Sequence, residues 1–197
     1  MKTTIFTIIA ASIATLSTSA FASTTLNTIG SFNAIEVHGN VELVVANGEK
    51  NNVELNNNYY AENAMVQTSN GTLRIASYTA EKLVVYVTAN DLRSIEAFDN
   101  ASVKSEGKLS AIQMEVSLHN NASATLNLDN FAANVTVDDA AKADISGNVT
   151  EYAFNHSLTS VVNQKALVAD NRAEKVIIPV VIAKAQTNND DLLVIAD

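Results

Sequence analysis

Apolar and polar residues alternate along much of this chain, and between Leu92 and Val162 the alternation recurs in about four similar segments. The apolar positions align in columns, two of which are Ile95, Val116, Val135 with Tyr152 and Ala97, Leu118, Val137 with Phe154. Alternation with a period of two is typical of strands that bury one face. Recurrence every 17 to 21 residues is typical of a solenoid, so this stretch predicts strands stacked in successive coils.

Six shorter strands are predicted before the repeat, because apolar residues alternate there between clusters of Gly and Asn. They are expected at residues 34–38, 41–46, 52–55, 65–68, 73–77 and 82–88. Asn70-Gly71 lies between two of these strands and is a strong signal for a tight hairpin, because both residues accept positive φ. Residues 59–64 predict a single helical turn.

The first 22 residues have the pattern of a secretory signal peptide. Lys2 supplies the positive start, residues 5–16 are apolar but too few to span a bilayer, and Ala20-Phe21-Ala22 has the form of a cleavage site. We therefore expect an exported protein, periplasmic, secreted or at the cell surface, with a single domain over residues 23–197. No later apolar run has the length of a transmembrane helix, so no membrane insertion is expected.

The regular repeat, at about residues 92–162, is expected to fade toward the C-terminus, because Arg172 stands where the column requires an apolar residue. Two apolar stretches follow, at residues 176–182 and 192–195. The end of a solenoid exposes unpaired backbone groups unless another segment covers it. We therefore expect C-terminal strands within about residues 174–197 to cap the repeat.

The formal net charge of −9 disfavours nucleic acid and anionic membrane surfaces as partners, since both are polyanions. The chain contains no Cys, which excludes disulfides, thiolate chemistry and metal sites built on Cys. It also contains no sequence motif of a zinc protease, a serine hydrolase or a nucleotide-binding enzyme. Composition thus excludes several classes of function without naming a partner.

Five short stretches occur in an order that is typical of a known family. They are Phe32-Asn33-Ala34-Ile35-Glu36-Val37-His38-Gly39, Val41-Glu42-Leu43, Asn70-Gly71-Thr72-Leu73-Arg74-Ile75, Leu83-Val84-Val85-Tyr86-Val87-Thr88-Ala89 and Asp91-Leu92-Arg93-Ser94-Ile95. They resemble the head GIN domain, the “putative auto-transporter adhesin” family of bacterial exported proteins, over about residues 31–162. Asp91 stands where the family usually has Pro, and Asn and Asp stand at corners where it usually has Gly and Ser. The resemblance implies a right-handed, β-helix-like fold outside the cytoplasm and supplies no established catalytic residue.

The polar corners between strands contain the candidate site residues. In the predicted register Phe98, His119, Asp138 and Asn155 share one position, and Asp99, Asn120, Asp139 and His156 share the next. Because neighbouring coils stack about 4.8 Å apart, His119 would lie near Asp138, and Asp139 near His156. Such a cluster could bind a divalent metal. Turn chemistry alone also places Asn, Asp and His at corners, and this interpretation is favoured, so neither a metal nor a cofactor is expected.

Asp138, Asp139 and Asp144 suggest a second kind of site, because some β-helix proteins bind or cleave polysaccharide with carboxylates on one face. Glycoside hydrolysis needs two carboxylates at a defined separation, one of them with a raised pKa. Sugar-processing sites also commonly contain aromatic platforms, and this chain has no Trp. A solvated acidic face is therefore favoured, and no catalytic residue is assigned.

Pattern and resemblance together predict an all-β domain, a right-handed parallel β-helix-like solenoid with coils of about 17–21 residues. We expect a non-enzymatic, exported binding or structural module of the cell envelope. An adhesin-like role is one version of this expectation, and a glycan or a protein surface is the expected partner. One alternative is a polysaccharide-active enzyme or glycan-binding protein that uses the acidic corner face. A further alternative is a homo-oligomer in which the ends of two solenoids pair.

Overall fold

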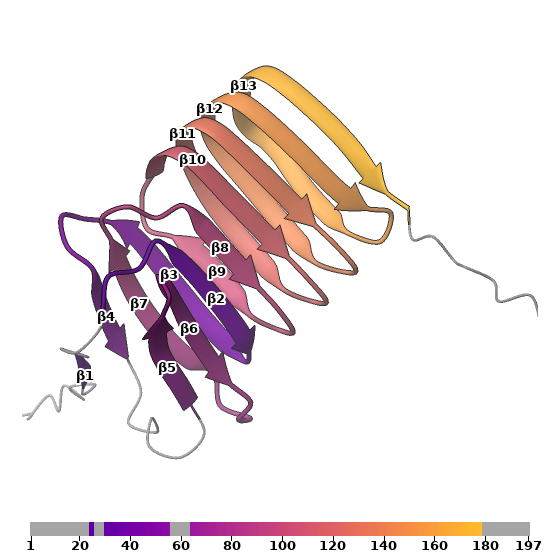
Figure 1. The fold of residues 1–197 in the computed structure, drawn as a ribbon. Helices are drawn as coiled ribbons and strands as arrows, with labels where there is room; N and C mark the ends of the chain where they lie inside the picture. Colours follow the sequence, from indigo (N-terminus) through magenta and orange to yellow (C-terminus); the bar gives the residue numbers. More distant parts are fainter. Residues whose placement is uncertain (1–23, 26–29, 56–63, 179–197) are drawn as a thin grey trace, which may run out of the picture.

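The chain folds into one curled sheet of 13 strands, as seen in a computed structural model that describes residues 24–25, 30–55 and 64–178 (Figure 1). The strands are β1 Thr24–Thr25, β2 Ala34–Gly39, β3 Val41–Asn47, β4 Asn52–Leu55, β5 Ala64–Ser69, β6 Thr72–Ser77, β7 Leu83–Ala89, β8 Ser94–Ala97, β9 Ser102–Ser105, β10 Leu109–Leu118, β11 Ser123–Val137, β12 Lys142–Ser157 and β13 Val161–Ile177. No helix occurs within the described ranges. The predicted all-β class is confirmed, in the form of a sheet that curls into a half-barrel.

Two arms of the sheet meet at a stack of long strands. The first arm has the order β1-β4-β7-β3-β9, and the second has the order β5-β6-β2-β8. The stack consists of β10 to β13, which pair in parallel in chain order (Figure 1). The first residues of β11 pair with β9 of the first arm, whereas the last residues of β10 pair with β8 of the second arm. Each long strand therefore connects the two arms across a bend, and the core lies between them.

The core is formed by alternate residues that point inward from both arms. Val135 and Val137 are fully buried, whereas Thr136 between them is only partly buried. This confirms the orientation that the period of two predicts. The buried side chains are mostly Val, Leu, Ile and Ala, and each fully buried Val, Leu or Ile side chain contributes about 1.5–3 kcal/mol.

The six short strands differ from their predicted bounds by at most one residue at either end. The predicted hairpin is also confirmed, since β5 and β6 pair in antiparallel fashion on either side of Asn70-Gly71. Asn70 has a φ of 51° and Gly71 a φ of 79°, as a tight turn between two strands requires.

The register of the last predicted repeat is wrong by two positions. Val135 pairs with Phe154, and Val137 pairs with His156, where the aligned corners had placed Tyr152 and Phe154. The polar pair Asn155-His156 resembles a corner in the sequence, but β12 continues through it and the chain turns at positions 158 and 159. The shortest predicted coil, from Val135 to Tyr152, was therefore wrong, because the true coil extends to Phe154.

The parallel ladder passes the position at which the regular repeat was expected to fade. β13 pairs with β12 from Val161 to Ile177, and Arg172 lies within this pairing. Arg172 occupies the position next to Tyr152 in this ladder. A parallel ladder is held by backbone hydrogen bonds, so a charged residue in an inward column need not end it when its side chain remains partly exposed.

Some expectations concern residues outside the described ranges. They include the signal peptide at residues 1–22, the C-terminal capping strands beyond residue 178 and the helical turn at residues 59–63. The last residue of that expected turn, Ala64, begins β5. Within the part of the chain that the structure describes, no helix has both the length and the apolar character of a membrane span.

Candidate functional site

The predicted corner residues form a row of left-handed turns on successive coils. Asp99, Asn120 and Asp139 have φ values of 59°, 58° and 53°. Asp139 Oδ2 accepts a hydrogen bond from the backbone N–H of Asn120 at 2.9 Å, and Asn120 Oδ1 accepts one from the N–H of Asp99 at 3.2 Å. The row continues to the first arm, where Asp99 Oδ2 accepts from the N–H of Gly39 at 3.0 Å. Each corner side chain thus holds the backbone of a neighbouring coil, which is a structural use of Asp and Asn.

The other candidate acids are bound in a similar local way. Asp138 Oδ1 accepts a hydrogen bond from the backbone N–H of Asp139 at 2.9 Å. Asp144 lies within β12 rather than at the corner, and its carboxylate accepts a hydrogen bond from Asn163 Nδ2 at 3.1 Å. Asp138 and Asp139 are therefore together at one corner, and Asp144 is not with them.

The candidate histidines belong to aromatic stacks rather than to a cluster with Asp138 and Asp139. His119 stacks on Phe98 with 4.8 Å between ring centroids, and its Nε2 lies 3.7 Å from Glu96 Oε1. His156 stacks on Phe154 at 4.9 Å, and its Nε2 lies 3.2 Å from Glu174 Oε1. The register places His156 beside Val137 rather than beside Asp139, so that predicted pairing was wrong. His119 and Asp138 directly follow the paired Leu118 and Val137, as the predicted register had placed them. Among the described residues, no three His, Cys, Asp or Glu side chains converge as a metal site would require.

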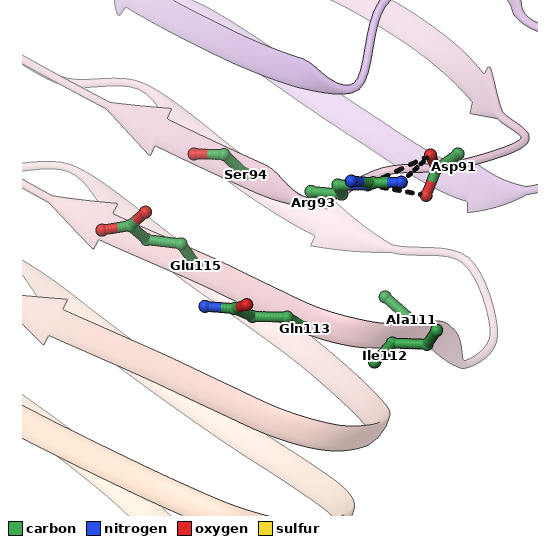
Figure 2. A pocket seen from close by; sticks show the side chains of 7 residues that line it. All are labelled: Asp91, Arg93, Ser94, Ala111, Ile112, Gln113 and Glu115. Atoms are coloured by element: carbon green, nitrogen blue, oxygen red, sulfur yellow. Dashed lines mark hydrogen bonds and ion pairs between the residues drawn. The ribbon is translucent and has the colours of Figure 1, made fainter.

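A shallow groove on the outer face of the second arm was not found from the sequence. Its first part has a volume of about 350 Å³ and is lined by Asp91, Arg93, Ser94, Ala111, Ile112, Gln113 and Glu115 (Figure 2). An adjoining part of about 360 Å³ shares Gln113 and extends over β11, β12 and β13. The groove therefore crosses successive strands along the stack.

Small side chains and backbone form the floor of this groove. Three outward alanines, Ala132, Ala153 and Ala173, line the second part, together with the polar side chains of Asn134 and Asn171 among others. The alanines lie on three neighbouring strands, and such short side chains leave room for a ligand between longer neighbours. Asn134 Oδ1 accepts a hydrogen bond from Asn155 Nδ2, and Asn171 Nδ2 donates to Glu151. The other amide atoms, Asn134 Nδ2 and Asn171 Oδ1, can donate to a ligand and accept from it.

An ion pair forms one rim of the groove. The Arg93 guanidinium donates to Asp91 from Nε at 3.0 Å and from Nη2 at 2.7 Å, a two-point contact that Figure 2 shows beside Gln113 and Glu115 of β10. These hydrogen bonds lower the pKa of Asp91 and raise the pKa of Arg93. The pair is thus ionised across the ordinary pH range, and its two charges largely cancel.

Two exposed apolar side chains lie at the bend of successive strands: Ile112 lines the first part of the groove, and Phe131 precedes Ala132, which lines the second part. Ile112 is 84% exposed and Phe131 is 58% exposed. The neighbours of Ile112 pair with the neighbours of Phe131, so the two residues occupy equivalent positions on β10 and β11. Exposed apolar groups rimmed by polar residues mark interaction surfaces. The groove, together with the exposed side chains of Ile112 and Phe131, is the best candidate binding site in the described residues.

The inner face of the last coil contains a second polar group of residues. Gln164 Nε2 donates to the Tyr152 hydroxyl at 3.0 Å, and the Arg172 guanidinium lies over the Tyr152 ring at 5.8 Å. Arg172 also contacts Glu174 at 3.4 Å, and burial raises the pKa of Tyr152. Gln164, Arg172 and Glu174 border an open depression of about 450 Å³ at the end of the stack. The arrangement covers the aromatic end of the core with polar groups.

The comparison with known proteins points to one family. The family described as “Putative auto-transporter adhesin, head GIN domain” matches residues 31–176. None of the curated proteins matches the chain.

Several solved structures share the fold at low identity. A putative adhesin from Parabacteroides merdae has a TM-score of 0.65 at 14% identity, over 79% of this chain and 77% of that one. A putative adhesin from Parabacteroides distasonis has a TM-score of 0.61 at 16% identity, over 79% and 77%. A protein from the same species, described as a putative lipid binding protein, has a TM-score of 0.57 at 11% identity, over 79% and 78%. At these identities the likeness shows the fold alone.

Proposed function

Because the chain belongs to the family of head GIN domains described as putative auto-transporter adhesins, we propose that it is a non-enzymatic binding module of the cell envelope. The observation that carries the proposal is the groove on the outer face, which Ile112 lines and next to which the exposed Phe131 occupies the equivalent position on β11. A binding site needs accessible apolar contact area and hydrogen-bonding groups that set orientation. The groove supplies both on one rigid sheet, whose ladder positions each side chain relative to those on the next coil.

The ligand that fits this groove is an extended, uncharged polymer, with a polysaccharide as the leading candidate. The groove crosses several strands, so a ligand lying in it meets similar groups again on each coil. Asn134 and Asn171 offer neutral hydrogen bonds, and the Arg93–Asp91 pair adds little net charge. Glu115 and Glu151 line the groove together with Arg172, so beside the neutral Arg93–Asp91 pair two carboxylates face one guanidinium, and the negative balance disfavours an anionic polymer.

A polysaccharide-active enzyme remains the alternative of another class. A hydrolase of sugars uses one carboxylic acid with a raised pKa to protonate the leaving oxygen. In the groove the opposite holds for Asp91, whose pKa is lowered by the hydrogen bonds from Arg93. The corner acids Asp138 and Asp139 accept backbone hydrogen bonds. These contacts favour binding over hydrolysis at both places.

The experiment is a glycan array with the purified chain from residue 23 onward, followed by titration with the best-bound oligosaccharide. Phe131→Ala removes the exposed ring, and Ala153→Arg fills the floor of the groove, so each should weaken binding by about tenfold or more, equivalent to about 1.4 kcal/mol. Tyr78→Ala is the matched control, because Tyr78 is an aromatic residue exposed away from the groove. Equal affinity in all variants would reject the groove as the binding site.

A reducing-sugar assay on the same oligosaccharides separates binding from catalysis. A binding module leaves the number of reducing ends unchanged during prolonged incubation. Release of new reducing ends by the wild-type protein, lost in Asp138→Asn or Asp139→Asn, would instead establish the enzymatic alternative on the corner face.

Two finer features belong to the same proposal. The first 22 residues act as a cleaved signal peptide, which N-terminal sequencing of the native protein tests, since an intact Met1 would contradict it. The curled sheet belongs to the class of right-handed, β-helix-like solenoids. This assignment is supported by the parallel pairing of β10 to β13, which advances by a nearly constant step along the chain.

A further inference from the structure

The open depression on the inner face of β13, the outermost strand of the stack, is cationic in an acidic protein (Figure 1). Its lining contains two cationic side chains, Lys165 and Arg172, and one carboxylate, Glu174. The chain as a whole has a formal net charge of −9. An anionic group that most of the surface repels is therefore attracted at this place.

A β-bulge brings Lys165 to the depression. β13 has one residue more than β12 between Asn163 and Ala166, so Gln164 and Lys165 together oppose Ile145 alone. Ile145 is fully buried, so the bulge lies at an inward position, and both of its residues line the depression. Bulges re-aim side chains and occur often beside functional sites. The extra residue thus places an ammonium group on the inner face of the last coil.

The two cations of the depression differ in their partners. The Arg172 guanidinium donates to Gln164 and lies 3.4 Å from one carboxylate oxygen of Glu174. The other oxygen of Glu174 lies 3.2 Å from His156 Nε2. Among the described residues, no carboxylate lies within ion-pair distance of Lys165 Nζ. Glu174 is therefore engaged by two neighbours, and the Lys165 ammonium is available to an anion from solution.

Arg172 connects the depression with the groove, because it lines both the depression and the second part of the groove. Elsewhere in the groove, beside the neutral Arg93–Asp91 pair, the charged lining residues are Glu115 and Glu151. A polymer that follows the groove toward β13 passes these carboxylates before it reaches Arg172. The change in charge sets the direction in which a polymer with one acidic end lies.

We propose that the depression is a subsite for the carboxylate of an acidic sugar at one end of the polymer in the groove, with Lys165 as the residue that determines this specificity. The inference rests on the proposed binding of a polysaccharide and names the end group that is recognised. One carboxylate balances the one excess positive charge of Lys165, Arg172 and Glu174. A polymer with an acid on every unit would instead place carboxylates beside Glu115 and Glu151.

The experiment uses two forms of the neutral oligosaccharide that binds best on the array, one ending in glucose and the other in glucuronic acid. At low salt the wild-type protein should bind the acidic form about tenfold more tightly, because a charge-assisted contact is added. Lys165→Gln should remove this preference and leave the affinity for the neutral form unchanged. Lys175→Gln is the matched control, because it makes the same change of charge in the outward column of Thr136 and Asn155.

The outcomes separate the subsite from the groove. Equal affinity of the wild-type protein for the two forms would overturn the subsite while leaving the groove as a binding site. Equal loss of preference in Lys165→Gln and Lys175→Gln would also overturn it, by assigning the preference to net charge. If no neutral oligosaccharide binds, the proposed function fails, and the free monosaccharides still decide the subsite.

That second measurement is an NMR titration with free glucuronate, with glucose as the neutral probe. Glucuronate should shift the backbone amide signals of residues 164, 165 and 172 in the wild-type protein and not in Lys165→Gln, whereas glucose should leave them unchanged. The absence of these shifts, or equal shifts with glucose, would overturn the subsite. A short peptide that binds there more tightly through its C-terminal carboxylate would overturn the acidic sugar as the ligand.

Discussion

The two ends of the stacked sheet are closed in different ways. At the N-terminal end the ladder is reversed, because β4 and β5 pair antiparallel with β7 and β6, and the edge strands β1 and β5 have only 2 and 6 residues. At the C-terminal end β13 continues the parallel ladder over 17 residues. A short antiparallel strand limits the exposed edge, whereas a long parallel strand leaves an edge for another segment.

Side chains are also more deeply buried at the N-terminal end than at the C-terminal end. Val53 and Leu55 of β4 are fully buried although they lie near the edge of the first arm. In β13, the inward positions include Arg172 and Glu174, whose side chains are 44% and 49% exposed. The comparison teaches that the N-terminal end is closed by apolar packing, while polar groups within the described residues cover the C-terminal end. Four predictions test this contrast.

The largest effect is expected in the middle of the stack, which serves as the reference for both ends. Val135→Asp introduces a carboxylate at a fully buried position, so it should prevent folding or cost about 3 kcal/mol or more. Thr136→Asp, on the outer face, should cost about 0.5 kcal/mol or less. Urea unfolding measures both, and equal damage would mean that the inward and outward columns are misassigned.

Replacing a leucine by alanine should reduce the free energy of unfolding by different amounts at the two ends. Leu55→Ala creates a cavity at a fully buried position in the N-terminal end and should cost about 3 kcal/mol. Leu167→Ala, at a partly buried position in β13, should cost about 1 kcal/mol in a protein that lacks the tail beyond residue 178. Equal costs at both ends in the shortened protein would contradict the contrast.

A smaller effect is expected at the corner row that links the two ends. Asp139→Ala removes the acceptor for the Asn120 N–H and places a residue that disfavours positive φ at a φ of 53°, so it should cost about 1–2 kcal/mol. Asp139→Asn keeps an acceptor and tolerates this φ, so thermal melting should show little change. EDTA should leave the Tm of the wild-type protein unchanged, and a drop reversed by one divalent ion would instead indicate a metal at the corners.

The smallest expected effect is the stability that two carboxylates in the N-terminal arms lose at acid pH. A hydrogen bond from His38, followed by contacts with Arg74, lowers the pKa of Glu36, and a hydrogen bond from Lys104 lowers the pKa of Glu42. A lowered pKa in the folded state gives stability that is present above the unfolded value of about 4.5 and is lost as the pH falls through the folded value. We expect each carboxylate to contribute about 0.5 kcal/mol.

Urea unfolding at about pH 7 and about pH 3.5 measures this difference. Glu36→Gln and Glu42→Gln should each reduce the loss of stability on acidification. Glu106→Gln is the control, because no basic side chain contacts the Glu106 carboxylate among the described residues. The same reduction in the control would assign the acid sensitivity to net charge rather than to these ion pairs.

The candidate groove shows where a sequence pattern misleads. Counting back by twos from buried Val135 and Ala133 assigns Phe131 to the core, but Phe131 is 58% exposed. The bend between the two arms places buried Asn130 before it and partly buried Ala132 after it, so the alternation shifts by one position. Ile112 is displaced outward at the equivalent bend of β10. A local period cannot reveal such a shift, because the bend arises from how the arms pack around the core.

The sequence by itself determined the all-β class, the inward orientation of Val135 and Val137 and the hairpin at Asn70-Gly71, because each depends on near neighbours along the chain. Only the tertiary structure decided that His156 lies beside Val137 and that the corner carboxylates bind the backbone of a neighbouring coil. Register between coils depends on backbone bonds and packing between positions that a whole coil of chain separates. Two alignments that differ by two positions bury the same faces, so the period of two cannot distinguish between them. The packing of the stacked core selects one of the two.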